Sequence, residues 1–173
     1  MPYLPQKSSI LPYSVQFINN NFLRPLKIQS LNLQGTRIND ISSLNGKSFD
    51  FLNLSHTPLW NLAPLKESHI NKLDISFSYI DGLWNLEQCQ LKELYVNNTK
   101  INTIPDEIML TIEVLDIKKT QIKELTSSSA PHLHSLNIAY NNIKNLDLLE
   151  SYPKLQTLTV HTGQLNSTLM KKL

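Results

Sequence analysis

The chain has little of what several function classes require. It contains a single cysteine, Cys89, which excludes an intrachain disulfide. It has only four glycines and no glycine-rich phosphate loop. Its 16 Lys and Arg against 14 Asp and Glu leave a formal net charge of +2, a small value for a protein that binds nucleic acid or an anionic membrane. We therefore expect neither as a partner.

Long apolar stretches are also absent. No run approaches the roughly 18 consecutive apolar residues of a transmembrane helix. Residues 1–15 lack the basic start and the apolar stretch of a signal peptide. We therefore expect a cytoplasmic protein, with a secreted protein as the alternative if a signal peptide has been removed. Cys89 is expected to be a partly buried, unreactive thiol.

What the sequence does contain is a repeat. Apolar residues recur at offsets of +3, +5, +10 and usually +13 from seven starting positions. These positions are Ile28, Phe49, Ile70, Leu91, Ile112, Leu133 and Leu155. The first five steps are 21 residues long and the last is 22. A period in this range indicates a solenoid, in which stacked units share one core.

The spacing of apolar residues changes inside each unit. Offsets +3 and +5 alternate as in a strand with one buried face. Offsets +10, +13 and +16 are three apart, which suits a 3₁₀ turn. Burying about six apolar side chains at roughly 2 kcal/mol each cannot offset the cost of about 1.5 kcal/mol for ordering each residue. One unit therefore cannot fold alone.

The segments LNLQGTRI, LDISFSYI, LYVNNTKI and LNIAYNNI resemble the leucine-rich repeat signature LxxLxLxxNxL. The resemblance covers seven consecutive units. It implies a curved, right-handed α/β solenoid with a parallel β-sheet on the concave side and 3₁₀ or short turns on the convex side. It also implies protein binding through the concave face.

The chain departs from this signature at the usual Asn position, offset +8. The residues there are Thr36, Thr57, Ser78, Thr99, Thr120, Asn141 and Gly163. A hydroxyl can donate and accept as an amide does, so we expect these side chains to satisfy backbone groups at the bend. Thr at this position resembles short-repeat bacterial members of the family, which suggests a bacterial source.

Residues 1–27 do not match the repeat and are expected to form an N-terminal cap. Val15, Ile18 and Phe22 have helical spacing, which predicts a partly helical cap. A degenerate repeat in extended conformation is the alternative. Residues 28–173 then form the seven repeats. No polar capping segment follows the seventh, so that end could be buried in an oligomer, or the chain could be a piece of a longer protein.

Side chains at offsets +2, +4 and +6 should face the concave surface, and those at +7 and +9 lie just past the strand. Aromatic and charged residues gather there in units 3 to 6, a composition typical of protein contacts. The expected contact residues are Lys72, Asp74, Phe77, Tyr79, Glu93, Tyr95, Asp116, Lys118, Lys119 and Tyr140. The alternative is that the aromatic rings pack on neighbouring units and the charges only keep the sheet soluble.

Two further expectations qualify this surface. Asn and Asp are frequent at offset +4 across the family, so Asp74 and Asp116 are also candidates for a structural role. Trp60 and Trp84 fall on the return arc, where we expect them to pack partly on the convex side.

The spacing of the reactive side chains argues against an enzyme, a metal or a cofactor. Asp74 and Asp116 lie two strands apart, roughly 10 Å, whereas a retaining glycosidase pair needs about 5 Å. His132 and His134 are short of a zinc ligand set, and no histidine accompanies Cys89. An inverting carboxylate pair would fit the separation, but nothing in the sequence implies a sugar-binding cleft.

The sequence therefore favours a non-catalytic protein-binding module. The alternatives are a regulatory or substrate-recruiting domain of a larger enzyme such as a bacterial kinase, a secreted effector or adhesin, and a phosphatase-regulator scaffold. A nucleic-acid binder using Lys100, Lys118, Lys119 and Tyr95 is a further class. The partner protein itself is not identified by any of these residues.

Overall fold

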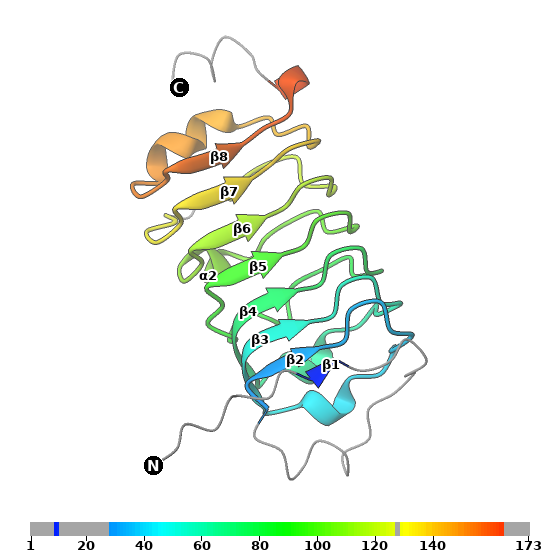
Figure 1. Ribbon diagram of the computed structural model, residues 1–173. Coiled ribbons are helices and arrows are strands. Elements are labelled where there is room, and N and C mark those ends of the chain that lie inside the picture. The colour runs from blue at the N-terminus through cyan, green and yellow to red at the C-terminus, as the bar shows by residue number, and fades with distance from the viewer. Residues whose placement is uncertain (1–8, 11–27, 127–128, 165–173) are drawn as a thin grey trace.

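The computed structural model describes residues 9–10, 28–126 and 129–164. Within these residues eight strands form one parallel sheet in chain order. The strands are β1 (Ser9–Ile10), β2 (Ser30–Asn32), β3 (Ser48–Asn53), β4 (His69–Asp74), β5 (Glu93–Tyr95), β6 (Val114–Asp116), β7 (Ser135–Asn137) and β8 (Thr157–Thr159). Figure 1 shows them stacked one above the next, and β2 to β7 are each followed by a loop on the same side of the stack.

In units 1, 2, 4 and 6 a short helix lies on the opposite side, where the chain returns to the next strand, and one more directly follows β8. Four are 3₁₀ turns and one is a single α-helical turn in the part of the chain described. They are η1 (Ser42–Leu44), η2 (Ala63–Leu65), α2 (Asp106–Met109), η3 (Leu146–Ser151) and η4 (Thr162–Gln164). The predicted α/β solenoid, with a parallel sheet on the concave side and short turns on the convex side, is confirmed.

The strand register reproduces the sequence period. Leu31 pairs with Leu52, 21 residues on, and Leu136 pairs with Leu158, 22 residues on. The residues at offset +3 of units 1 to 6 are at most 1% exposed. They are Leu31, Leu52, Leu73, Leu94, Leu115 and Leu136. Stacking thus gives each apolar residue a neighbour in the adjacent unit, and in unit 7 the equivalent Leu158 is only partly buried.

Strand β1 is one strand more than the repeat predicts, and it pairs with Leu31 and Asn32 of unit 1. It is the only part of the expected cap over residues 1–27 that the structure describes. The helix expected near Val15 to Phe22 lies outside the described residues, as does the chain after residue 164.

The predicted hydroxyl contacts at the bend are present. Five side chains at offset +8 donate a hydroxyl hydrogen to the carbonyl oxygen three residues earlier, at 2.6–2.9 Å. These are Thr36, Thr57, Ser78, Thr99 and Thr120, which together with Asn141 we call the hydroxyl row. Asn141 differs, because its amide reaches back one unit: Nδ2 donates to the Ile117 carbonyl at 2.6 Å and Oδ1 accepts from the Thr120 N–H at 2.8 Å.

The residue before the hydroxyl row has a left-handed backbone in six consecutive units, with φ between 54° and 69°. We call these residues the left-handed row: Gly35, His56, Phe77, Asn98, Lys119 and Tyr140. In the first five, the N–H donates to a carbonyl of the next unit at 2.8–3.0 Å. This conformation therefore extends the ladder beyond the strand while turning the chain so that the next side chain points inward.

Cys89 is fully buried and donates its Sγ–H to the Leu65 carbonyl at 3.1 Å. This burial is deeper than the partial burial expected, and it raises the pKa of the thiol to about 11, so the thiol stays neutral at pH 7. The two tryptophans are more exposed than expected, Trp60 at 66% and Trp84 at 62%. Trp84 packs its ring over the backbone of Gly82, where a side chain would collide with it.

Candidate functional site

Strands β3, β4 and β5 bring four side chains together on the sheet. The register pairs Phe51 with Lys72 and Lys72 with Glu93, and Tyr95 lies on the same strand as Glu93. Lys72 Nζ lies 2.8 Å from Glu93 Oε2, and the Tyr95 hydroxyl donates to the same oxygen at 2.9 Å. Lys72 Nζ also lies 5.5 Å and 5.0 Å from the ring centroids of Phe51 and Tyr95. We call these four residues the sheet cluster.

The electrostatics of the sheet cluster stabilise its charged forms. The hydrogen bond from Lys72 lowers the pKa of Glu93 despite partial burial, and the same bond raises the pKa of Lys72. Burial raises the pKa of Tyr95, which keeps the phenol neutral. The Lys72 and Glu93 side chains remain 38% and 34% exposed. The cluster is thus an ordered ion pair between two aromatic rings, open to solvent on one face.

Asp74 and Asp116 have a structural role at the ends of their strands. Asp74 Oδ1 accepts from the Ser76 N–H at 2.9 Å, and Asp116 Oδ1 accepts from the Lys118 N–H at 2.9 Å. Three amides at the same offset make the equivalent bond: Asn32, Asn53 and Asn137. Such short side chains close a turn by accepting from the backbone two residues on. Burial raises the pKa of Asp116, so its charge adds no stability there.

The other predicted contact residues lie past the strands, on the row of loops that follows the arrowheads in Figure 1. We call the side chains at offsets +6, +7 and +9 of units 1 to 6 the loop edge. Phe77, Tyr79 and Tyr140 are exposed there by 46%, 68% and 58%. Lys118 and Lys119 lie on the same edge. The ten predicted residues therefore divide between two surfaces, five on the sheet and five on the loop edge.

Stacked rings order the loop edge at two places. His56 stacks on Phe77 with ring centroids 4.2 Å apart and planes 12° from parallel. His161 lies against Tyr140 at 4.3 Å and 41°, and Lys118 Nζ is 5.5 Å from the Tyr140 ring centroid. The sequence did not single out either histidine. The position of each histidine in the repeat is the only signal in the sequence: each lies one unit away from an aromatic residue of the loop edge.

A groove of about 650 Å³ runs along the loop edge over units 1 to 3. Its lining contains the stacked pair, and no carboxylate takes part. The lining residues are Gln34, Gly35, Thr36, Arg37, His56, Thr57, Pro58, Phe77 and Tyr79. The groove is therefore aromatic and proline-walled, with its charge of one sign only.

Comparison with known proteins agrees with this geometry. No family model matches the chain. Human lumican is 28% identical over 144 residues, which cover 74% of this chain and 43% of lumican. Toll-like receptor 2 of Macaca mulatta is 27% identical over 113 residues, 65% of this chain and 12% of the receptor. Both are leucine-rich repeat proteins.

The chain is thus similar in sequence to leucine-rich repeat proteins. Among solved structures, internalin C2 of Listeria monocytogenes superposes with a TM-score of 0.68 at 21% identity, covering 80% of this chain and 66% of that one. The InlJ functional domain from the same organism gives 0.60 at 18% identity, covering 84% and 36%. These two likenesses concern the fold. This chain spans less than half the length of human lumican.

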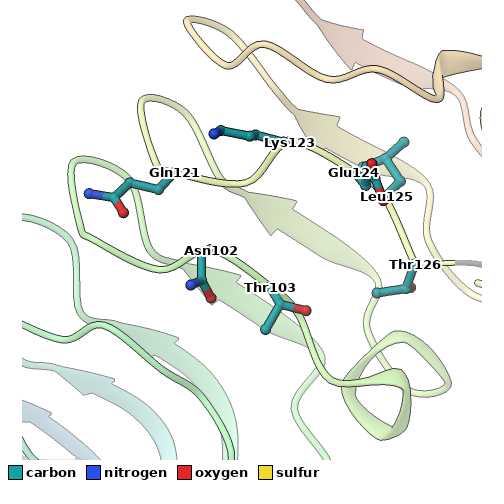
Figure 2. A pocket seen from close by; sticks show the side chains of 7 residues that line it. All are labelled: Asn102, Thr103, Gln121, Lys123, Glu124, Leu125 and Thr126. Atoms are coloured by element: carbon teal, nitrogen blue, oxygen red, sulfur yellow. The ribbon is translucent and has the colours of Figure 1, made fainter.

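A second hollow of about 720 Å³ lies on the return arc of the solenoid. Figure 2 shows its side chains spread over two successive loops. They are Asn102, Thr103, Gln121, Lys123, Glu124, Leu125 and Thr126. One carboxylate, one amine and no imidazole or thiol do not make a hydrolytic or metal-binding set.

Over residues 9–10, 28–126 and 129–164, no three His, Cys, Asp or Glu side chains are grouped to hold a metal ion. No helix among these residues has the length and apolar character to cross a membrane. Repeat proteins of the kinds that it resembles are typically protein-interaction modules without catalytic activity.

Proposed function

We propose that this leucine-rich repeat protein is a non-catalytic module that binds another protein through the concave sheet, with the sheet cluster at the centre of the contact. The observation that carries the proposal is the bonding of Lys72 and Tyr95 to one oxygen of Glu93, at 2.8 Å and 2.9 Å. Side chains held in this way lose little conformational freedom when a partner covers them.

The composition of the sheet cluster supports the same proposal. Tyrosine and other aromatic residues carry a large share of the binding energy at protein interfaces. Tyr95 and Phe51 present rings on a sheet whose backbone is bonded on both sides. The strand-end carboxylates of Asp74 and Asp116 support the turns beside the cluster, so in this proposal they shape the surface more than they contact the partner.

A photo-crosslinking experiment tests the concave contact. Benzoylphenylalanine is placed at Val114, whose strand partner is Glu93, and in a matched variant at Leu110, which is 52% exposed next to α2. Irradiation in extracts of the native host should attach a protein to position 114 and not to position 110. Adding Tyr95→Phe, which removes one bond of the cluster, should lower the yield. Equal yields at both positions, or a yield at 110 alone, would reject the concave contact.

We also propose a cytoplasmic location. It is supported by the chemistry of Cys89, a neutral thiol that is fully buried and hydrogen-bonded to a backbone carbonyl, which needs no oxidising compartment. Fractionation of the native host with an antibody to the protein tests this. Recovery in the cytosol supports it, and recovery in the medium or at the cell surface contradicts it.

A further inference from the structure

The loop edge carries charge of one sign. Its 18 positions in units 1 to 6 contain none of the 14 Asp and Glu of the chain. They do contain Arg37, Lys100, Lys118 and Lys119. Lys72 pairs with Glu93 and Lys92 with Glu113, and neither salt bridge involves a lysine of the edge.

The fold does not account for the side chains of the left-handed row. A left-handed backbone suits glycine, as at Gly35, because a Cβ atom meets the backbone there. Phe77, Lys119 and Tyr140 occupy this conformation and are exposed, so no packing in the core compensates for it. Residues held in unfavourable conformations at a surface are a sign of function.

The loop edge has two chemically distinct ends. The aromatic groove occupies units 1 to 3, and the lysines follow in units 4 and 5. The ends adjoin, because the N–H of Lys100 donates to the carbonyl of Ile80 in the unit of Tyr79. Lys119 lies one unit beyond Lys100, and with units about 4.8 Å apart the centre of the groove lies roughly 10 Å from Lys100. An extended peptide covers that distance with about three residues.

The number of positive charges along the loop edge indicates whether a nucleic acid strand or a peptide fits it better. From Gly35 to Tyr140 the edge spans five steps, about 24 Å. A nucleic acid strand with one phosphate per 3.4 Å would place about seven charges over that length. The four cations of the edge, three of them in two adjacent units, cannot match them, and the carboxylates of Asp74 and Asp116 lie on the adjacent sheet. A peptide with few acidic residues matches the edge better.

We propose that the loop edge is a second contact surface, which takes an extended segment of a partner protein with apolar side chains at one end and carboxylates at the other. The apolar side chains enter the groove beside Phe77 and Tyr79, and the carboxylates, about three or four residues away, face Lys100 and Lys119. This inference rests on the proposed function as a protein-binding module, but it concerns a surface that the sheet cluster does not include.

Selection from a displayed library of random peptides on the full chain tests the inference. The enriched peptides should carry apolar residues about three positions from Asp or Glu. A labelled synthetic copy of the most enriched peptide is then titrated onto Phe77→Gly and Lys119→Gly. Both sites have positive φ, so glycine should not disturb the fold. Affinity should fall about tenfold or more, as for the loss of a central contact. Asn98→Gly, the matched control in the same row, should change it less than about twofold.

Each other outcome decides against the loop edge. Enrichment of basic peptides, or of no peptide, would overturn the inference. A peptide that loses affinity with Tyr95→Phe but not with Phe77→Gly would bind the sheet cluster. That result would support the proposed function and overturn the inference about the loop edge. A peptide unaffected by any of these variants would contradict both proposals. Tighter binding of single-stranded oligothymidine than of the peptide, lost with Lys119→Gly, would assign the edge to nucleic acid instead.

Discussion

The left-handed row and the hydroxyl row are adjacent in units 1 to 6, yet their side chains differ in burial, in chemical type and in hydrogen bonding. The hydroxyl row is buried or half-buried, and its five hydroxyls and the Asn141 amide all donate to backbone carbonyls. The left-handed row contains glycine, imidazole, two aromatic rings, an amide and an amine, which are mostly exposed. The difference shows at which positions the repeat restricts the residue type. A side chain that satisfies a buried backbone group can be replaced only by one that makes the same hydrogen bond, whereas the residue type in the left-handed row can vary.

The largest effect is expected where the fold dictates the residue. Thr99→Val keeps the shape of the side chain but leaves the Val96 carbonyl without its 2.6 Å hydroxyl partner. We expect the free energy of unfolding to fall by about 1–3 kcal/mol. Thr99→Ser keeps the hydroxyl, as Ser78 has it naturally, and should lower the free energy of unfolding by less. Urea unfolding followed by circular dichroism measures both. Equal losses would mean that the methyl group, not the hydrogen bond, distinguishes this row.

The strand-end carboxylates sharpen the same distinction. Asp116→Ala leaves the Lys118 N–H without its acceptor, at a cost of about 1 kcal/mol. Asp116→Asn keeps the acceptor, as Asn137 does one unit later. Burial raises the pKa of Asp116, so the charged form is disfavoured and the neutral amide should match or exceed wild-type stability at pH 7. A loss with Asn as large as with Ala would show that the charge is required.

Cys89 occupies another position that the backbone dictates. Its thiol donates to the carbonyl 24 residues earlier, and Ser68 makes the same bond one unit before it. Cys89→Ser should therefore change the free energy of unfolding by less than about 1 kcal/mol. The native thiol, with its pKa raised to about 11, should not react with a thiol reagent at pH 8 until urea unfolds the chain. Rapid labelling of the native protein would contradict this burial.

The smallest effect is expected on the exposed face of the sheet. Lys72 lowers the pKa of Glu93 in the folded chain, so the ion pair contributes stability above the ordinary carboxyl pKa near 4.3, and this is lost as pH falls through the lowered value. The side chains are about one-third exposed, which limits the contribution to less than about 1 kcal/mol. The stability difference between wild type and Lys72→Met should shrink below about pH 4. A difference that is constant from pH 7 to 3 would assign Lys72 to packing alone.

Much of the fold could be predicted from the sequence because the residues that recur with the period are the apolar residues buried in the core. Leu31, Leu52 and Leu73 recur at one offset, and one offset means one place in the core. The hydroxyl contacts could also be predicted, since Thr and Asn share the ability to donate and accept. Both predictions depend on residue types that a single physical role requires.

The site was harder to predict because its geometry contradicts local preference. Phe77, Lys119 and Tyr140 disfavour positive φ, and only Gly35 and Asn98 in the same column hinted at it. The left-handed bend after each strand separates the loop residues from the sheet residues, and without it the sequence groups both on one surface. The ring pair of His56 and Phe77 depends on side-chain rotamers, which periodicity does not report. Strand β1 falls before the repeat, so no offset located it.

The central claim is that the fold requires the hydroxyl row and does not require the side chains beside it. The most direct test is the sign of two stability changes at adjacent residues, Lys119→Gly and Thr120→Val, measured by urea unfolding. Relief of positive φ at Lys119 should raise the free energy of unfolding by about 0.5–1 kcal/mol, net of the greater freedom of glycine in the unfolded chain. Loss of the bond from Thr120 to the Ile117 carbonyl should lower it by about 1–3 kcal/mol. Destabilisation by both substitutions would contradict the claim.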